Sequence, residues 1–195
     1  MPYTRLSMNF QPKSARQLRR QFLLGSLVAL AGWKSFVNGI SPALAAYPLP
    51  IQQAAPPMTQ AIIDQNGDSF RIDSFHGQPV LINFWATWCT PCVAEMKSLQ
   101  MAAERLQPDG IEVLLISVDH GDVDKALAVL QSNGVTAPRF GFDPKAELFL
   151  QMGVEGLPTS FLLSADHLQC LVYFGPREWH EDSIQTDMRN FLNNH

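Results

Sequence analysis

Acidic residues are absent from the start of this chain: residues 1–45 contain no aspartate or glutamate and six of its 14 lysines and arginines. The remainder therefore holds eight basic residues against all 18 acidic residues, a net charge of −10. A body this acidic does not favour nucleic acid or anionic membrane surfaces. The charge pattern thus argues against nucleic-acid binding.

The sequence also has no apolar run long enough to span a bilayer comfortably. Its main apolar run, 22–33, is broken at Lys34, short of the roughly 20 residues that a spanning helix needs. The basic region before the run and Ala43-Leu44-Ala45 after it are typical of an export signal and its cleavage pattern. We therefore predict an export signal over 1–45 and a periplasmic or equivalent lumenal location.

Two features of this signal are open to more than one interpretation. Arg19-Arg20 resembles the twin-arginine export signal, and the alternative is an ordinary secretory signal that happens to hold two adjacent arginines. An uncleaved signal that anchors the protein to a membrane is a second hypothesis. Four prolines between residues 46 and 60 predict an extended linker, which leaves 61–195 as the folded domain.

The domain alternates strand and helix patterns. An Asn66-Gly67 turn predicts an N-terminal hairpin of 61–63 with 69–72. Further strands are expected over 79–85, 111–118, 159–163 and 168–174, and helices over 92–106, 122–133, a short span between Pro144 and Gly153, and 183–192. Because helices separate the central strands, parallel pairing is expected there. The sequence predicts an α/β domain with a mixed central sheet covered by helices on both faces.

Cysteines are few: Cys89, Cys92 and Cys170 are the only three. An odd count argues against a purely structural disulfide framework. In an oxidising compartment, a C-x-x-C pair is expected to cycle between dithiol and disulfide.

The C-x-x-C pair lies where a buried strand gives way to a helix. Cys89 is expected at the helix start, where unpaired N–H groups and the helix dipole favour its thiolate. Cys92 follows one turn later, within reach of a disulfide, and Pro91 is tolerated in the first turn. We predict Cys89 as the exposed nucleophile and Cys92 as the resolving thiol.

Other interpretations of the pair are weaker. A c-type haem attachment needs His after the second cysteine, where this chain has Val93. A structural zinc site needs two further ligands at suitable spacing, and only scattered histidines and Cys170 are available. An inert structural disulfide is the third alternative. We therefore predict no metal and no cofactor.

The segment from Val80 to Met96 resembles the active-site signature of the thioredoxin superfamily. More narrowly, the chain from about Met58 onward is similar to the TlpA/ResA/DsbE-type branch of exported thioredoxin-like reductases. The resemblance implies a thioredoxin-like fold with an N-terminal β-hairpin and a β–α insert. It also implies exported thiol-containing client proteins, as in cytochrome c maturation or copper-centre assembly, and an upstream membrane thiol reductant.

The resemblance assigns roles to particular residues. Pro158 matches a cis-proline that faces the C-x-x-C, so that Leu157 can pair with an extended substrate, with Thr159 beside it. Glu95 matches an acidic residue that would raise the thiol pKa values and shuttle the proton of the resolving thiol. Trp88 and Pro91 are expected to flank the substrate.

Two further positions refine the comparison within the superfamily. Asn83 stands where thioredoxin has a buried aspartate, so proton handling would fall to Glu95. Strong oxidants of the superfamily carry His where this chain has Pro91, which favours a potential nearer the ~−270 mV of thioredoxin than the ~−120 mV of DsbA. Cys170 is expected to be a buried free thiol. His120 is expected on a surface loop, and the alternative is that it faces the site.

Two functions of other classes use the same fold. A thiol peroxidase would need a P-x-x-x-T-x-x-C pattern, whereas Phe84 and Thr87 precede Cys89 by five and two residues. A copper chaperone of the Sco type would bind Cu(I) through C-x-x-x-C and a distal His, a spacing that this chain lacks. The main prediction is an exported thiol–disulfide oxidoreductase.

Overall fold

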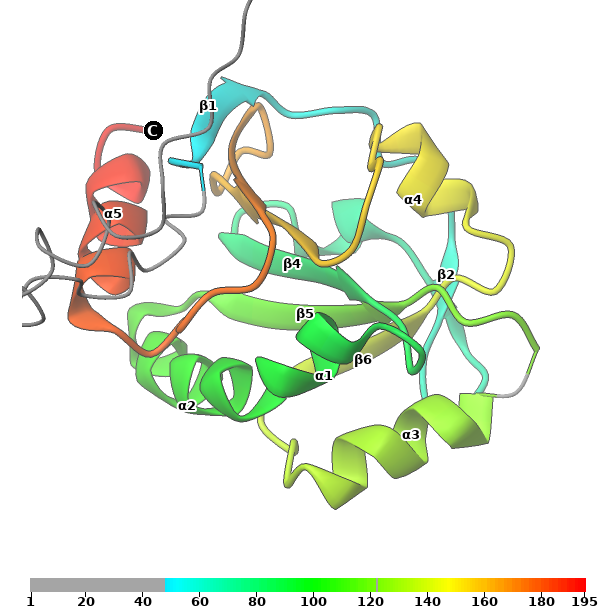
Figure 1. Ribbon diagram of the computed structural model, residues 1–195. Helices are drawn as coiled ribbons and strands as arrows, with labels where there is room; N and C mark the ends of the chain where they lie inside the picture. The colour runs from blue at the N-terminus through cyan, green and yellow to red at the C-terminus, as the bar shows by residue number, and fades with distance from the viewer. Residues whose placement is uncertain (1–47, 122) are drawn as a thin grey trace, which may run out of the picture. The chain divides into compact units, whose positions relative to one another are not determined.

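The computed structural model describes residues 48–121 and 123–195, so the predicted export signal over 1–45 lies outside the described residues. Figure 1 shows a central sheet with helices around it. The elements are β1 (Ile51–Ala54), β2 (Ile62–Ile63), β3 (Ser69–Phe70), β4 (Val80–Trp85), α1 (Thr90–Ala94), α2 (Met96–Leu106), β5 (Glu112–Ser117), α3 (Val123–Ser132), β6 (Arg139–Phe142), α4 (Glu147–Gln151), β7 (Thr159–Leu163), β8 (Gln169–Phe174) and α5 (Asp182–Leu192). Within this part of the chain, none of the helices is both long enough and apolar enough to cross a membrane.

The sheet is mixed, as predicted, and its strand order is β1-β8-β7-β4-β5-β6-β2-β3. β4 lies at the centre, parallel to β5 and antiparallel to β7, and all six of its residues are buried. The nearly continuous apolar run Val80–Trp85 is what a strand covered on both faces requires. β5 and β6 are parallel, and the expected hairpin of β2 with β3 is present at the sheet edge.

Successive β4 residues face opposite helices, because side chains alternate along a strand. Asn83 donates to Glu95, at the junction of α1 and α2, with a 2.8 Å Nδ2–Oε1 distance. Phe84 instead packs edge-on against Phe149 of α4, with ring centroids 5.7 Å apart. α5 joins the α2 side through the ion pair of Arg105 with Asp182. Helices therefore cover both faces of the sheet, as expected.

Two strands were missed by the sequence analysis. β1 lies inside the segment predicted as a linker over 46–60, and it pairs with β8 from Ile51 opposite Val172. All four β1 side chains are exposed, so no apolar alternation marks this strand; backbone pairing alone defines it. β6 contains Gly141, where a Cβ would lie 2.8 Å from the Ile62 Cδ1 atom. Glycine is needed for that close approach, and it weakens the strand pattern.

The helix predicted over 92–106 is divided into α1 and α2. The division falls at Glu95, whose φ of −86° and ψ of −4° depart from helical values. This break sets a carboxyl group at the end of the short helix that is capped by Cys89 and contains Cys92.

Candidate active site

Cys89 and Cys92 form a disulfide at the start of α1. The S–S distance is 2.02 Å and the two Cα atoms are 5.3 Å apart, so the predicted reach of the two sulfurs is confirmed. Cys89 caps the helix, because its Sγ accepts a hydrogen bond from the Cys92 backbone N–H at 3.3 Å. Pro91 lies in the first turn, where a backbone donor is not needed.

The two cysteines differ in access. Cys92 is fully buried and Cys89 is only 6% exposed, so the prediction of an exposed nucleophile needs correction. Cys89 is reached through a groove that opens beside it rather than from a flat surface. Trp88, the preceding residue, is 69% exposed and stands at the edge of that groove.

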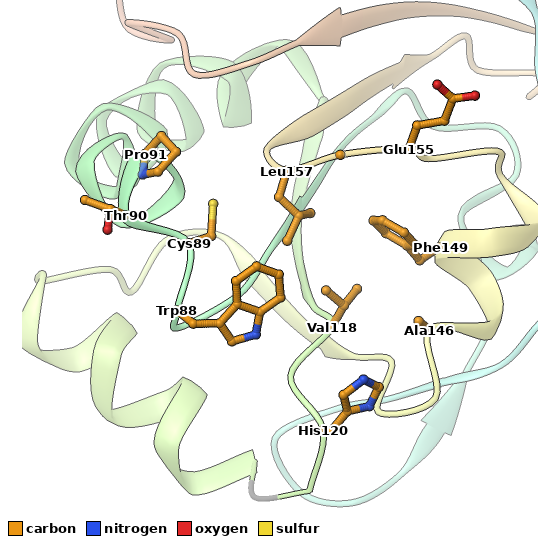
Figure 2. Close-up of a pocket in the computed structure, with 11 residues that line it drawn as sticks. Trp88, Cys89, Thr90, Pro91, Val118, His120, Ala146, Phe149, Glu155 and Leu157 are labelled. Carbon is orange, nitrogen blue, oxygen red and sulfur yellow. The ribbon is translucent and has the colours of Figure 1, made fainter.

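The groove next to Cys89 is a cavity of about 630 Å³ (Figure 2). Most of its lining is apolar. It is lined by Trp88, Cys89, Thr90, Pro91, Val118, His120, Ala146, Phe149, Glu155, Gly156 and Leu157. Figure 2 shows the Cys89 sulfur near Pro91 and Leu157, with the ring of Trp88 on its other side. The groove can therefore hold an apolar segment against the sulfur.

The Leu157–Pro158 peptide bond is cis, as predicted. Leu157 lines the groove, whereas Pro158 and Thr159 are buried and are not among its lining residues. The Thr159 hydroxyl donates to the Gly156 carbonyl at 2.8 Å. Of the expected substrate-binding residues, Trp88, Pro91 and Leu157 thus meet at the groove, and Thr159 holds the loop from behind.

Glu95 is buried, with 3% of its surface exposed, and it is not among the residues that line the groove. Its Oε1 accepts from Asn83 Nδ2 at 2.8 Å, and its Oε2 accepts from the Arg177 N–H and the Trp179 Nε1–H, both at 2.9 Å. Burial raises the Glu95 pKa to about 7, and the three donors oppose that rise because they favour the charged form. Asn83 also donates to the Ser160 hydroxyl at 2.9 Å.

Sequence reasoning missed several residues around the site. Arg177 and Trp179 contact Glu95 from 82 and 84 residues away, and no local pattern marks them. Phe149 and Val118 form the far wall of the groove and read in the sequence only as apolar core positions. His120 is exposed, and its Nδ1 lies 2.8 Å from the Pro144 carbonyl oxygen.

Cys170 is a buried free thiol in β8, as predicted. Burial raises its pKa to about 11, so the thiolate is disfavoured. Across residues 48–121 and 123–195, no group of three His, Cys, Asp or Glu side chains is placed to hold a metal ion.

Curated relatives share sequence with this chain. ResA of Geobacillus thermodenitrificans, a thiol-disulfide oxidoreductase by name, is 29% identical over 153 residues, 77% of this chain and 83% of that protein. ResA of Bacillus thuringiensis subsp. konkukian is 31% identical over 105 residues, 54% of this chain and 60% of that protein. The thiol:disulfide interchange protein DsbE of Escherichia coli K12 is 33% identical over 124 residues, 62% and 64%. The chain thus spans about 60% of the length of the Bacillus thuringiensis ResA.

Solved structures confirm the fold. The thioredoxin domain of a thiol-disulfide oxidoreductase from Bacteroides vulgatus superposes with a TM-score of 0.60 at 16% identity, covering 73% of this chain and 99% of that one. A thioredoxin family protein from Chlorobium tepidum gives 0.59 at 21% identity, covering 72% and 97%. The model of the AhpC/TSA family matches residues 51–168. The chain belongs to the AhpC/TSA family and has a thioredoxin-like fold.

Proposed function

We propose that this protein is a thiol–disulfide oxidoreductase that exchanges two electrons with client proteins through Cys89 and Cys92. One observation carries the proposal: the disulfide opens on an apolar groove through Cys89, while Cys92 is buried directly behind it. This is the arrangement that exchange needs, with one accessible sulfur and one resolving sulfur. The names of the ResA and DsbE relatives support the same reaction class.

In the reducing direction, the reaction has two exchange steps. The Cys89 thiolate attacks a client disulfide, forming a Cys89–client bond as the client S–S bond breaks, and the released client sulfur takes a proton. The Cys92 thiolate then attacks the Cys89 sulfur, restores the Cys89–Cys92 disulfide and releases the second client thiol. The Cys92 N–H, which donates to the Cys89 Sγ, stabilises negative charge on Cys89 before attack.

Glu95 is suited to accept the proton that Cys92 must lose. It follows Cys92 by three residues, about one helical turn, at the end of α1. A carboxyl with a pKa of about 7 changes protonation state near neutral pH, where a proton acceptor is most effective. We assign it this role alongside the two cysteines.

The client is proposed to lie along the groove in extended form. Trp88, Pro91 and Leu157 contact its apolar side chains at the groove. The cis bond at Pro158 presents the Leu157 backbone for pairing with the client, and Thr159 fixes that loop. Clients with an apolar residue next to the reactive cysteine are favoured by this lining.

The cellular setting is part of the proposal. The basic, acid-free segment 1–45 supports export to the periplasm or an equivalent compartment, where exported thiol proteins are the clients and a membrane thiol reductant is the electron source. Pro91 supports the reducing direction. Because β1 pairs within the sheet, we propose that the folded domain starts at about Ile51 rather than at residue 61.

Reduction of insulin disulfides by the reduced protein tests the proposal. Cys89→Ser is expected to abolish activity, and Cys170→Ala, which removes a thiol outside the site, should retain it. Disulfide reduction by Cys89→Ser at the wild-type rate would refute the proposal. A peroxide-consumption assay on the same variants separates this function from that of a thiol peroxidase.

A further inference from the structure

The segment after β8, residues 175–180, covers Glu95 although it is remote in sequence. Two of the three hydrogen bonds to the Glu95 carboxyl come from this segment, through the Arg177 N–H and the Trp179 indole N–H. Trp179 is fully buried, and its ring packs edge-on against Tyr173 with centroids 5.1 Å apart. The Glu95 carboxyl is therefore held by residues 175–180, which belong neither to α1 nor to the groove lining.

This segment is held at several points. At its start, the Gly175 N–H donates to the Pro158 carbonyl at 2.9 Å, which ties it to the cis-proline loop. At its end, the His180 N–H donates to the Ser98 hydroxyl of α2 at 3.3 Å. Gln185 of α5 donates to the Trp179 carbonyl at 3.2 Å. Such anchoring fixes the direction in which the indole N–H points.

We propose that Trp179 is the positioning residue of Glu95: its indole N–H fixes Oε2, so that a residue outside the active-site helix controls when the carboxyl can take a proton. The proposal rests on the proposed function, in which Glu95 serves Cys92. In this role Trp179 acts only through Glu95, and not by contact with a client.

The hydrogen bonds also indicate which oxygen receives the proton. A carboxylate oxygen accepts about two hydrogen bonds in good geometry. Oε2 already accepts two, from Arg177 and Trp179, whereas Oε1 accepts one, from Asn83. The proton therefore binds at Oε1, and the two hydrogen bonds to Oε2 remain in both protonation states.

The charged and titratable groups around Glu95 come from three elements. Arg177, in the same segment, lowers the Glu95 pKa through its charge. His180 ends the segment, bonded to Ser98 and 3.7 Å from Glu178. Cys92 precedes Glu95 on α1, and Tyr173 of β8 has a buried hydroxyl without a hydrogen-bond partner among the described residues.

Loss of the indole donor shifts the proton equilibrium in a defined direction. A hydrogen bond to the charged form favours it, so removal of the Trp179 N–H raises the Glu95 pKa. In Trp179→Phe the ring remains and only the donor is lost, and we expect a rise of about one pKa unit. Tyr173→Phe is the matched control, because it removes a buried hydroxyl beside the same ring and should leave the Glu95 pKa unchanged.

The experiment is a pH titration of the oxidised full-length protein by NMR, with ¹³C-labelled glutamate carboxyls and Glu95→Gln to assign the signal. In the wild type, the Trp179 indole N–H resonance should titrate with the same midpoint as the Glu95 carboxyl. This readout on the wild type does not depend on Trp179→Phe, so it decides the proposal even if that variant does not fold. An indole resonance that stays flat while Glu95 titrates, or an unshifted Glu95 in folded Trp179→Phe, would overturn it.

Failure of this proposal can be distinguished from failure of the proposed function. Failure of the wild type to reduce disulfides would remove the function, while the NMR titration would still report the contact. With the function intact, the pH profile of disulfide reduction in Trp179→Phe should move to higher pH by the same amount as the Glu95 midpoint. A profile equal to that of the wild type would contradict the positioning role.

Discussion

The two thiol regions of this protein are made of the same residue type and are both largely buried, yet they are built for opposite chemistry. Cys89 begins a helix, accepts a backbone N–H and borders an open groove. Cys170 lies within the sheet, between β1 and β7, with its sulfur 3.9 Å from the Ala54 carbonyl oxygen. Its raised pKa of about 11 follows from burial.

The comparison shows that overall exposure is a poor guide to reactivity in this fold. Cys89 is only 6% exposed, but its sulfur meets a groove and an N–H donor, and a carboxyl lies one turn beyond its partner. Cys170 is fully buried and forms no disulfide with any cysteine in the part of the chain that the structure describes. Local donors and access by a second sulfur decide which thiol can exchange.

Removal of the resolving thiol should have the largest effect on turnover. In Cys92→Ala, Cys89 can still attack a client disulfide, but no second sulfur releases the product, so a mixed disulfide accumulates. Non-reducing electrophoresis and mass spectrometry should detect the adduct on Cys89. The same trap in a Cys170→Ala background is the control and should give equal yield. Absence of any adduct would break the distinction between the two thiol regions.

Glu95 should make stability depend on pH. Its folded pKa of about 7 lies above the ordinary 4.5, so its contribution to stability is full below about pH 4.5 and is lost as the pH rises through about 7. The expected loss is up to about 3 kcal/mol. Urea unfolding at about pH 5 and about pH 8 should show this slope in the wild type but not in Glu95→Gln.

The matched control for that slope is Glu155→Gln, which neutralises an exposed carboxyl at the groove. It should keep the pH dependence of the wild type. If Glu95→Gln and the wild type lose stability equally between the two pH values, the buried carboxyl does not titrate in this range.

Trp88 should act on client binding rather than on stability, since its side chain is exposed. Trp88→Ala is expected to raise the KM for a protein disulfide about tenfold, a loss of roughly 1.4 kcal/mol of apolar contact. Leu150→Ala is the matched control, because Leu150 is also 69% exposed but does not line the groove. Equal KM values for the two variants would remove Trp88 from the client site.

Cys170→Ala should have the smallest effect. Replacing a buried thiol by a methyl group leaves a small void, so we expect a loss of about 1 kcal/mol in the free energy of unfolding and no change in disulfide reduction. Parallel measurements of urea unfolding and insulin reduction check both parts. A marked loss of activity at unchanged stability would mean that Cys170 takes part in exchange.

The sequence was most informative where local pattern and chemistry coincide. The apolar run of β4, the helix start at Cys89 and the proline at residue 158 each have a short-range signal, and the strand, the disulfide reach and the cis bond are confirmed. β1 was not predicted because its side chains are all exposed and show no alternation of apolar and polar residues. Trp179 could not be connected with Glu95, since only the fold brings together residues 84 positions apart.

The reduction potential of the Cys89–Cys92 pair tests the central claim most directly. The protein would be equilibrated in glutathione or dithiothreitol redox buffers, alkylated, and read by mass spectrometry at each cysteine. The account predicts one two-electron transition shared by Cys89 and Cys92, nearer ~−270 mV than ~−120 mV, with Cys170 unchanged throughout. A transition that involves Cys170, or none at Cys89 and Cys92 across the range, would contradict it.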